Sequence, residues 1–205
     1  MHSSSHRKHA FTLIELLIVI TVIVILMGLL FPAFRGVQDQ AKKTQAKNDL
    51  IQIVTAVNAF YTEYGKYPLT PASPADTTYG TSTTNDKLFN ELRNSSTVTD
   101  NTRGIVFISP PDAKDSANPR TGIAPTGSGS VGQYFDPWGK PYFVRIDTDY
   151  DNQVDNPYSA NAGSTPKLQS GAIAWSLGKD GDGAKGTASG DKKTGIYDDD
   201  VISWQ

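Results

Sequence analysis

Apolar residues form one uninterrupted run near the amino terminus. Residues 11–34 read FTLIELLIVITVIVILMGLLFPAF, and Glu15 is the only charged residue among these 24. About 20 apolar residues are enough for a helix to cross a bilayer, so the run predicts a transmembrane helix over residues 11–34. Pro32 lies near the far end, where its missing backbone donor kinks the helix or weakens it locally.

A second helical pattern follows over residues 35–68. Its apolar residues recur every three or four positions, which indicates one face of an amphipathic helix packed against a small domain. These positions are Ala46, Leu50, Ile53, Val57, Phe60 or Tyr61, and Tyr64. Lys42, Lys43, Lys47 and Asp49 lie off this stripe. Gly65 suits the end of the helix, and Pro68 prevents its continuation beyond Tyr64.

Residues 69–205 predict a small globular domain. Apolar runs indicate strands over residues 104–109, 142–147, 171–177 and 201–204, and NDKLFNELR indicates a short helix over residues 85–93. The rest of residues 69–133 is rich in Ser, Thr, Asn, Gly and Pro and is expected to be loop, with a flexible insertion at 121–132. The long polar loop is a partner surface or filler, and filler is favoured. The predicted fold class is α+β, with the long helix packed on an antiparallel sheet.

Charge and composition exclude several function classes. The chain has 19 basic and 21 acidic residues, and removing residues 1–10 would leave 17 and 21, a net charge of −4. Proteins that bind nucleic acid usually carry a basic surplus, so we expect no nucleic-acid partner. The absence of cysteine excludes disulfides, thiolate zinc sites and cysteine catalysis.

The first ten residues are basic and precede the apolar run. His2, His6, Arg7, Lys8 and His9 form this basic head, which should stay in the cytoplasm by the positive-inside rule and leave the polar carboxy-terminal part outside the inner membrane. A secretory signal has its small-residue cleavage site behind a shorter apolar core. Here the small residue, Ala10, lies in front of the run. The apolar helix would therefore survive processing.

Glu15 is the unusual residue of the apolar run. A carboxylate in such a segment is costly and indicates a functional site by default. The alternative is an interfacial residue on an ordinary anchor, which reaches the lipid headgroups.

Two acidic clusters are candidate calcium sites, because Ca²⁺ takes six to eight oxygen ligands. The first offers carboxylates from SLGKDGDG and from DDDVISW, and glycines that let the backbone turn towards an ion. Its candidate ligands are the carbonyl of Leu177 and the side chains of Asp180, Asp182, Asp198, Asp199 and Asp200. The alternative is a solvated acidic turn.

The second cluster is DTDYDNQVD. Its acidic residues are Asp147, Asp149, Asp151 and Asp155. The start resembles the first half of an EF-hand loop, but Asn152 replaces the usual Gly and no Glu stands at the twelfth position. An acidic hairpin turn is favoured here over a second ion site.

Catalysis has little support. All three histidines lie in the basic head, and the acidic clusters lie in Gly-rich turns with no apolar pocket suggested around them. We expect that the chain is not an enzyme.

The string KHAFTLIELLIVI resembles the class III signal of type IV prepilins and pseudopilins. The resemblance implies that a prepilin peptidase cuts between Ala10 and Phe11 and methylates the new amino terminus. Ala10 departs from the Gly that the family usually has before the cut. Glu15 falls at the family's buried glutamate and Pro32 at its helix-loosening proline. Glu15 would then pair with the Phe11 amine of a neighbouring subunit and fix the stagger between subunits.

Three further strings resemble the major pseudopilins of type II secretion systems: YTEYGKYP, DPWGKPY, and SLGKDG with DDDVISW. The resemblance implies a calcium loop formed by the Leu177 carbonyl, Asp180 and two of Asp198, Asp199 and Asp200. It also implies a structural subunit of the inner membrane, with a periplasmic carboxy-terminal domain. Such a subunit polymerises with copies of itself, other pseudopilins and the inner-membrane secretion platform into a periplasmic pseudopilus that drives secretion.

Two alternatives remain beside this interpretation. One is a type IV pilin for adhesion, motility or DNA uptake, although such pilins often close a carboxy-terminal loop with a disulfide, which this chain lacks. The other is a membrane-anchored calcium-binding enzyme.

Overall fold

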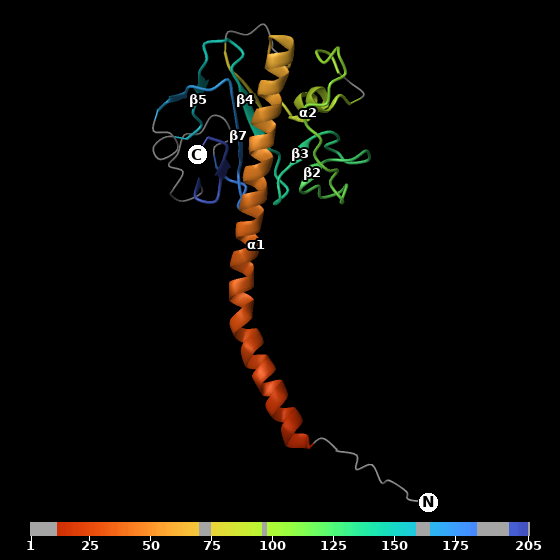
Figure 1. The fold of residues 1–205 in the computed structure, drawn as a ribbon, viewed down its shortest axis with the longest axis vertical. Coiled ribbons are helices and arrows are strands. Elements are labelled where there is room, and N and C mark those ends of the chain that lie inside the picture. The colour runs from red at the N-terminus through yellow and green to blue at the C-terminus, as the bar shows by residue number, and fades with distance from the viewer. Residues whose placement is uncertain (1–11, 70–74, 96–97, 159–164, 184–196, 205) are drawn as a thin grey trace, which may run out of the picture. The chain divides into compact units, whose positions relative to one another are not determined.

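The computed structural model describes residues 12–69, 75–95, 98–158, 165–183 and 197–204, and for residues 29–33 only the backbone. The helices are α1 (Leu13–Tyr64) and α2 (Asp86–Arg93) (Figure 1). The strands are β1 (Thr77–Tyr79), β2 (Gly122–Ile123), β3 (Tyr134–Phe135), β4 (Phe143–Ile146), β5 (Val154–Asp155), β6 (Lys167–Leu168), β7 (Ala172–Ser176) and β8 (Val201–Ile202). The chain forms two compact units, Met1–Ala41 and Lys42–Gln205, and α1 contributes to both.

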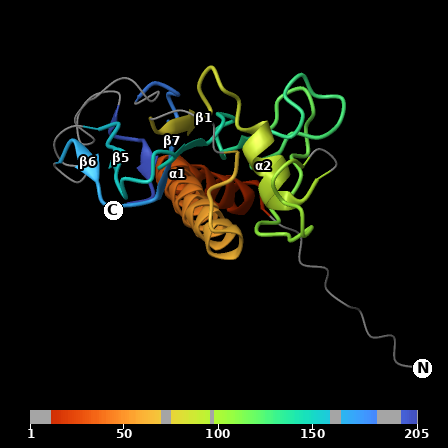
Figure 2. The same ribbon diagram turned by 90° about the horizontal axis from the view of Figure 1, so that it is seen from above.

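An antiparallel sheet organises the second unit. Its strand order is β1-β4-β7-β8, with Thr77 opposite Ile146 and Trp175 opposite Ile202. Two short pairs, β2 with β3 and β5 with β6, accompany it. The sheet lies against the second half of α1, with α2 on one side of the helix and β5 and β6 on the other (Figure 2). This confirms the predicted α+β class.

The predicted stripe of α1 forms the main core. Ala46, Leu50, Ile53, Val57 and Phe60 are all fully buried, against one face of the sheet and against α2. Side chains on a strand alternate between its faces, so alternate residues of β4 and β7 complete this core. The inward residues of α2 are Leu88, Phe89 and Leu92, as predicted.

The opposite face of the sheet has a second apolar cluster. Phe143, Ile173 and Trp175 point to it, and Val154 and Tyr158 cover it. The sheet is therefore buried on both faces over β4 and β7, which explains why all nine of their residues are buried.

Two residues off the predicted stripe are nevertheless covered. Asp49 is only 9% exposed and accepts a hydrogen bond from the Tyr142 hydroxyl at 2.8 Å, and burial raises the pKa of its carboxyl. The Lys47 ammonium, half-buried, donates to the Ile202 carbonyl at 2.8 Å. The domain thus covers more of α1 than its apolar stripe.

The prediction of a strand over residues 104–109 was wrong. The amides of Phe107 and Ile108 both donate to the Leu92 carbonyl, at 2.8 and 3.3 Å. The segment therefore follows the carboxy-terminal end of α2, and Pro110 comes directly after it. The expected flexible insertion at 121–132 was also partly wrong, because its first residues form the buried strand β2.

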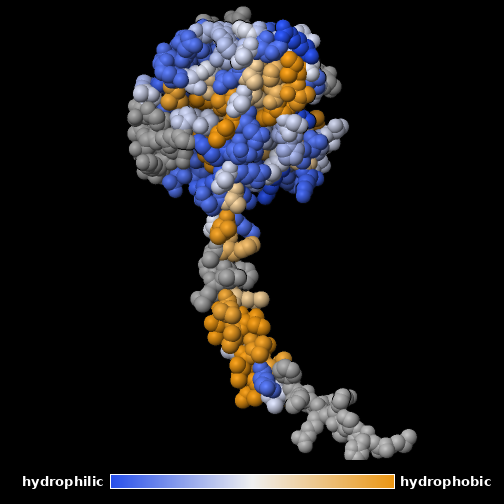
Figure 3. All heavy atoms as spheres, viewed as in Figure 1, coloured by the Kyte–Doolittle hydropathy of each residue, from blue (hydrophilic) through white to orange (hydrophobic). Residues whose placement is uncertain are grey.

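In the first unit, α1 exposes mostly apolar side chains from Leu13 to Met27. The exposed fractions of its apolar residues from Leu13 to Met27 range from 44% at Ile23 to 87% at Leu13 (Figure 3). In the described part of the chain, no helix combines the length and the apolar character needed to cross a bilayer. The predicted span over residues 11–34 includes Phe11 and the side chains of residues 29–33, which lie outside this description.

Candidate functional site

The amino-terminal end of α1 is built around Glu15. The backbone N–H and the hydroxyl of Thr12 donate to Glu15 Oε2, at 2.9 and 2.7 Å. The amide of Glu15 donates back to the Thr12 hydroxyl at 3.3 Å. This reciprocal arrangement is a capping box, which satisfies backbone donors that a helix start leaves open.

The Thr-x-x-Glu spacing of residues 12–15 is the sequence signal of this box. Glu15 therefore has a partner in its own chain through Oε2, and no described residue donates to Oε1. Ala10 and Phe11, the predicted processing residues, lie outside the described residues. α1 continues through Pro32, whose side chain is likewise outside the description.

The first predicted calcium cluster is partly assembled by the sheet. The pairing of Ser176 with Val201 brings the end of β7 beside the start of β8. Asp180, Asp199 and Asp200 each offer one carboxylate oxygen, and these three oxygens lie within 4.8 Å of one another. The amides of Lys179 and Asp180 donate to Asp199 Oδ2, which fixes the first loop against the second.

Two glycines allow this close approach. Gly178 has φ +63°, and a Cβ there would lie 2.5 Å from the Asp199 carbonyl oxygen. Gly183 has φ +144°, and a Cβ there would collide with the Asp200 carboxylate. Asp200 itself is 3% exposed, and its Oδ2 accepts a hydrogen bond from the Tyr158 hydroxyl at 2.5 Å. The loop thus holds three hard oxygens in a small space.

The other predicted ligands lie outside this group of three carboxylates. Asp182 and Asp198 are exposed and do not belong to the group of three. The Asp182 amide donates to Asp180 Oδ1 at 2.8 Å, so the backbone of Asp182 orients the Asp180 carboxylate while its side chain lies outside the group. Leu177 is buried directly after β7. Residues 184–196, between the two loops, lie outside the described residues.

The second acidic cluster contains other residues than the sequence predicted. Asp147 and Asp149 meet Asp76, again with carboxylate oxygens within 4.8 Å of one another. Asp76 precedes β1 and Asp147 follows β4, so the pairing of Thr77 with Ile146 places them side by side. Asp151 is not in this group, because it pairs with Lys167 at 3.0 Å, and Asp155 is not in it either.

Burial sets the electrostatics of this second group. It raises the pKa of the Asp76 carboxyl, and the charges of Asp149, Asp155 and Asp147 raise it further. The pKa of Asp147 is raised by burial and then by its hydrogen bond with Asp149. Asp76 was missed in the sequence because β1 was not predicted, and only its pairing with β4 reveals the contact.

The Asp136–Pro137–Trp138–Gly139 turn has a buried carboxylate at its centre. Asp136 is fully buried, and its Oδ1 accepts from the amides of Trp138 and Lys140 at 2.9 and 2.8 Å. Its Oδ2 accepts from the Ser176 hydroxyl at 2.5 Å, which ties the turn to β7. Desolvation raises the pKa of this carboxyl. The geometry agrees with a structural role for the turn.

Comparison with known proteins finds similarity over part of the chain. Residues 5–31 match the prokaryotic N-terminal methylation motif. A type IV major pilin protein, PilA of Myxococcus xanthus, is 39% identical over 61 residues, which is 30% of this chain and 28% of that protein. Type II secretion system core protein G is 36% identical over 64 residues in Pseudomonas aeruginosa and 28% identical over 67 residues in Pectobacterium carotovorum.

These matches cover only part of this chain and part of each relative. The two core proteins G match 31% and 33% of this chain, and the matched parts are 45% and 43% of their own lengths. The chain thus spans less than half the length of these curated relatives. No solved structure matches.

The chain carries the N-terminal methylation motif, and its long first helix packed against an antiparallel sheet is consistent with a pilin-like fold. Over about a third of its length, this chain is similar to the core proteins G of type II secretion systems and to a type IV major pilin.

Proposed function

We propose that this chain is a structural subunit of the periplasmic pseudopilus of a type II secretion system. One observation carries the proposal: the methylation motif at residues 5–31 overlaps the start of α1, where the apolar side chains from Leu13 to Met27 are 44–87% exposed. Contiguous apolar surface of this kind marks a membrane or protein interaction site. Lipid would cover it before assembly, and the helices of neighbouring copies would cover it afterwards.

The proposed sequence of events starts at the inner membrane. The basic head stays in the cytoplasm, residues 11–34 lie in the bilayer, and the second unit is periplasmic. Prepilin peptidase removes residues 1–10 and methylates Phe11. The chain then joins copies of itself, together with other pseudopilins and the secretion platform, and growth of the filament drives secretion.

Glu15 would set the register of this filament. In one copy, Thr12 donates both of its hydrogen bonds to Oε2, and a carboxylate has about four acceptor sites over its two oxygens. Oε1 is therefore available for the methylated amine of Phe11 in a neighbouring copy. In low dielectric, removing one member of such a pair leaves an uncompensated charge, so the pair selects one stagger.

Two substitutions of Glu15 separate register from helix capping. Glu15→Ala removes both the charge and the capping box, whereas Glu15→Gln keeps a residue that completes the box. We expect both variants to be made, inserted and processed, and both to fail to form filaments. Filaments with Glu15→Gln as abundant as wild type would refute the charge pairing, and filaments lost only with Glu15→Ala would assign Glu15 to capping.

Processing gives an independent test. Mass spectrometry of the assembled form should find an N-methylated Phe11 as the first residue. Assembled protein that still begins at Met1 would contradict the proposal.

We further propose that calcium binds Asp180, Asp199 and Asp200, with the Leu177 carbonyl as an additional ligand. The support is the chemistry of the donors: three carboxylate oxygens within 4.8 Å, backed by glycines at which a Cβ would intrude. The ion would neutralise the loop and hold β8 in place. Its role would be to stabilise the second unit for assembly, not to catalyse a reaction.

A type IV pilin is the second candidate function. The observation that favours it is the higher identity to PilA, 39% against 36% and 28% for the two core proteins G. A deletion strain distinguishes the two. Secreted proteins that accumulate in the periplasm indicate a pseudopilus, whereas loss of long surface filaments with normal secretion indicates a type IV pilus.

A further inference from the structure

Two buried side chains connect the turn at residues 136–140 to the start of the proposed calcium loop, residues 177–183. Asp136 and Ser176 are both fully buried. The Ser176 hydroxyl donates to Asp136 Oδ2 at 2.5 Å, and its oxygen accepts from the Gly178 amide at 3.1 Å. A hydroxyl has one proton to donate, and an amide N–H can only donate. The hydrogen bonds therefore run in one direction, from the Gly178 amide through the Ser176 hydroxyl to the Asp136 carboxylate.

This relay fixes the peptide that carries the proposed Leu177 ligand. The peptide bond between Leu177 and Gly178 is trans, and the N–H and the carbonyl of a trans peptide point in opposite directions. Because the Gly178 N–H points to Ser176 Oγ, the Leu177 carbonyl points away from Ser176. Gly178 also touches a proposed ligand, since a Cβ there would lie 2.6 Å from Asp199 Oδ2. The protein alone can thus set the orientation of this carbonyl.

The relay also acts on the charge of the Leu177 carbonyl. Successive hydrogen bonds polarise one another, and a buried environment strengthens them. As Asp136 draws the hydroxyl proton of Ser176, the hydroxyl oxygen becomes a stronger acceptor for the Gly178 amide. Electron density in the shared peptide then shifts towards the Leu177 oxygen. A more negative oxygen is a better ligand for a hard cation such as Ca²⁺.

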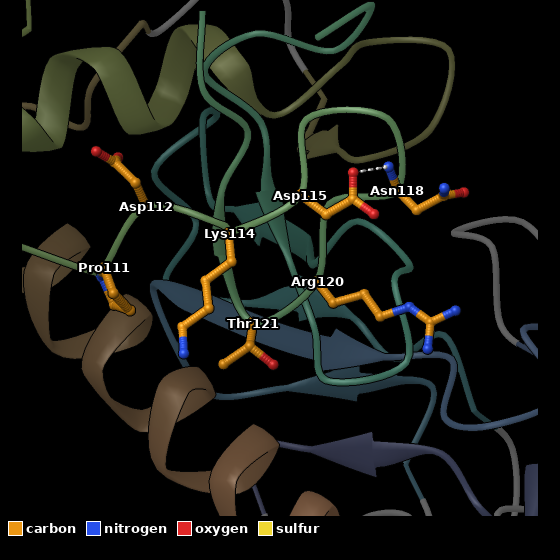
Figure 4. A pocket seen from close by; sticks show the side chains of 7 residues that line it. All are labelled: Pro111, Asp112, Lys114, Asp115, Asn118, Arg120 and Thr121. Atoms are coloured by element: carbon orange, nitrogen blue, oxygen red, sulfur yellow. Dashed lines mark hydrogen bonds between the residues drawn. The ribbon is translucent and has the colours of Figure 1, made fainter.

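The turn that supplies Asp136 is itself held by other segments. The Thr121 amide donates to the Asp136 carbonyl at 2.9 Å. Thr121 belongs to the wall of a pocket of about 810 Å³ (Figure 4). The turn also touches the calcium loop at a second point, because a Cβ at Gly181 would collide with the Lys140 side chain. The start of the loop is therefore attached to a turn that is fixed by its own neighbours.

We propose that Asp136 and Ser176 are positioning residues of the calcium site, which orient and polarise the Leu177 carbonyl for the ion. This inference rests on the proposed function, because it needs the proposed calcium site. It gives the turn at residues 136–140 a role in ion binding in addition to its structural role. Substituting residues that orient the ligands of a metal typically lowers its affinity 10–100-fold.

Removal of the Ser176 hydroxyl tests the relay. The full-length chain, purified in detergent, is titrated with calcium chloride by isothermal titration calorimetry. We expect Ser176→Ala to raise the dissociation constant of calcium about 10–100-fold. Ser170→Ala is the matched control, because the Ser170 hydroxyl donates to the Ala172 carbonyl at 2.8 Å, at the other end of β7. The control should leave the dissociation constant unchanged.

A second variant and a second measurement separate binding from folding. Ser176→Cys keeps the shape of the side chain but is only a weak donor and acceptor, so it should also lose affinity. If Ser176→Ala does not fold, Ser176→Cys decides in its place. Melting temperatures in chelator measure folding without the ion. A purely structural role would lower these temperatures and leave the calcium affinity of the folded chain unchanged.

Three results would overturn the inference. A folded Ser176→Ala variant that binds calcium as tightly as wild type would refute the relay and leave the calcium site standing. An equal loss of affinity in Ser170→Ala would assign the effect to the stability of β7. A wild-type chain that binds no calcium would refute the proposed calcium site and this inference with it, whereas the role as a filament subunit would stand.

Discussion

Removal of the proposed calcium ion is the perturbation with the best-defined structural consequence. Three carboxylate oxygens from Asp180, Asp199 and Asp200 lie within 4.8 Å of one another. At that separation, two unit charges repel by about 0.9 kcal/mol at the dielectric constant of water, and by about 3.5 kcal/mol at the value typical of protein surfaces. The three pairs therefore oppose folding by about 3 kcal/mol even under full solvent screening. A divalent cation reverses the sign of this contribution.

Ligand linkage gives the expected size of the change. Calcium at 100 times its dissociation constant would add about 2.7 kcal/mol to the free energy of unfolding. For a unit of this size, each kcal/mol moves the melting temperature by about 2–4 °C. We therefore expect a fragment that begins at Arg35 to melt about 5–11 °C higher in calcium than in chelator. Thermal unfolding followed by circular dichroism measures the shift.

Substitution of one ligand makes the test sharper, because its effect should change sign with calcium. Asp180→Asn removes two of the three repulsions, so in chelator the variant should be more stable than wild type by about 1–2 kcal/mol, after salt screening. In calcium it should be less stable than wild type. Asp182→Asn, on the same loop but outside the group of three, should keep the full calcium response.

Two outcomes would refute this reasoning. One is a melting temperature of wild type that does not differ between calcium and chelator, which would make the cluster a solvated acidic turn. The other is an Asp182→Asn variant that loses the response while Asp180→Asn keeps it, which would mean that the ligands are misassigned.

Two further predictions concern the core. The free energy of unfolding of wild type relative to Asp49→Asn should increase as the pH falls from 7 towards 4. Burial raises the pKa of Asp49 above its ordinary 3.8, so the folded state takes up the proton first and gains stability; urea unfolding that gives a constant difference would contradict this. Ile53→Ala, at a fully buried position, should cost about 2–5 kcal/mol in the same assay. Ile51→Ala, at a position 48% exposed, should cost no more than about 0.5 kcal/mol, and equal costs would contradict the assigned helix face.

The elements that the sequence predicted are those whose burial leaves an apolar pattern in their own residues. The stripe of α1 faces the sheet and α2 along its whole second half, so its spacing of three and four is unbroken. α2 is short, but its three inward residues are adjacent on one face. β4 and β7 were found because apolar side chains cover both of their faces, which leaves a continuous apolar run.

The missed elements depend on contacts between distant segments. β1 has the sequence Thr-Thr-Tyr, which carries no apolar alternation, and it exists because it pairs with β4. Residues 104–109 have a strand-like composition, yet Leu92 accepts hydrogen bonds from two of their amides and bends them around α2. The local sequence pattern does not reveal these hydrogen bonds, because the residues that accept or donate them lie elsewhere in the chain.

The same distinction applies to the candidate sites. Asp180, Asp182 and the three late aspartates, Asp198, Asp199 and Asp200, could be predicted as one cluster because the strands before and after the loop were both readable. Asp76 was not, because its position depends on β1. Which of the three late aspartates join Asp180 was left open by the sequence, and the pairing of Ser176 with Val201 brings in Asp199 and Asp200.

The capping box changes the physical problem that Glu15 poses. An isolated carboxylate in an apolar segment is strongly penalised, but here the hydroxyl and the backbone amide of Thr12 both donate to Oε2. In the proposed membrane-bound subunit, the residue is therefore tolerable without a partner from another chain, and it also starts the helix. The other oxygen keeps its full capacity to accept a hydrogen bond. A single side chain can in this way serve the stored subunit through Oε2 and the filament through Oε1, so assembly need not break the helix start in order to form the pair.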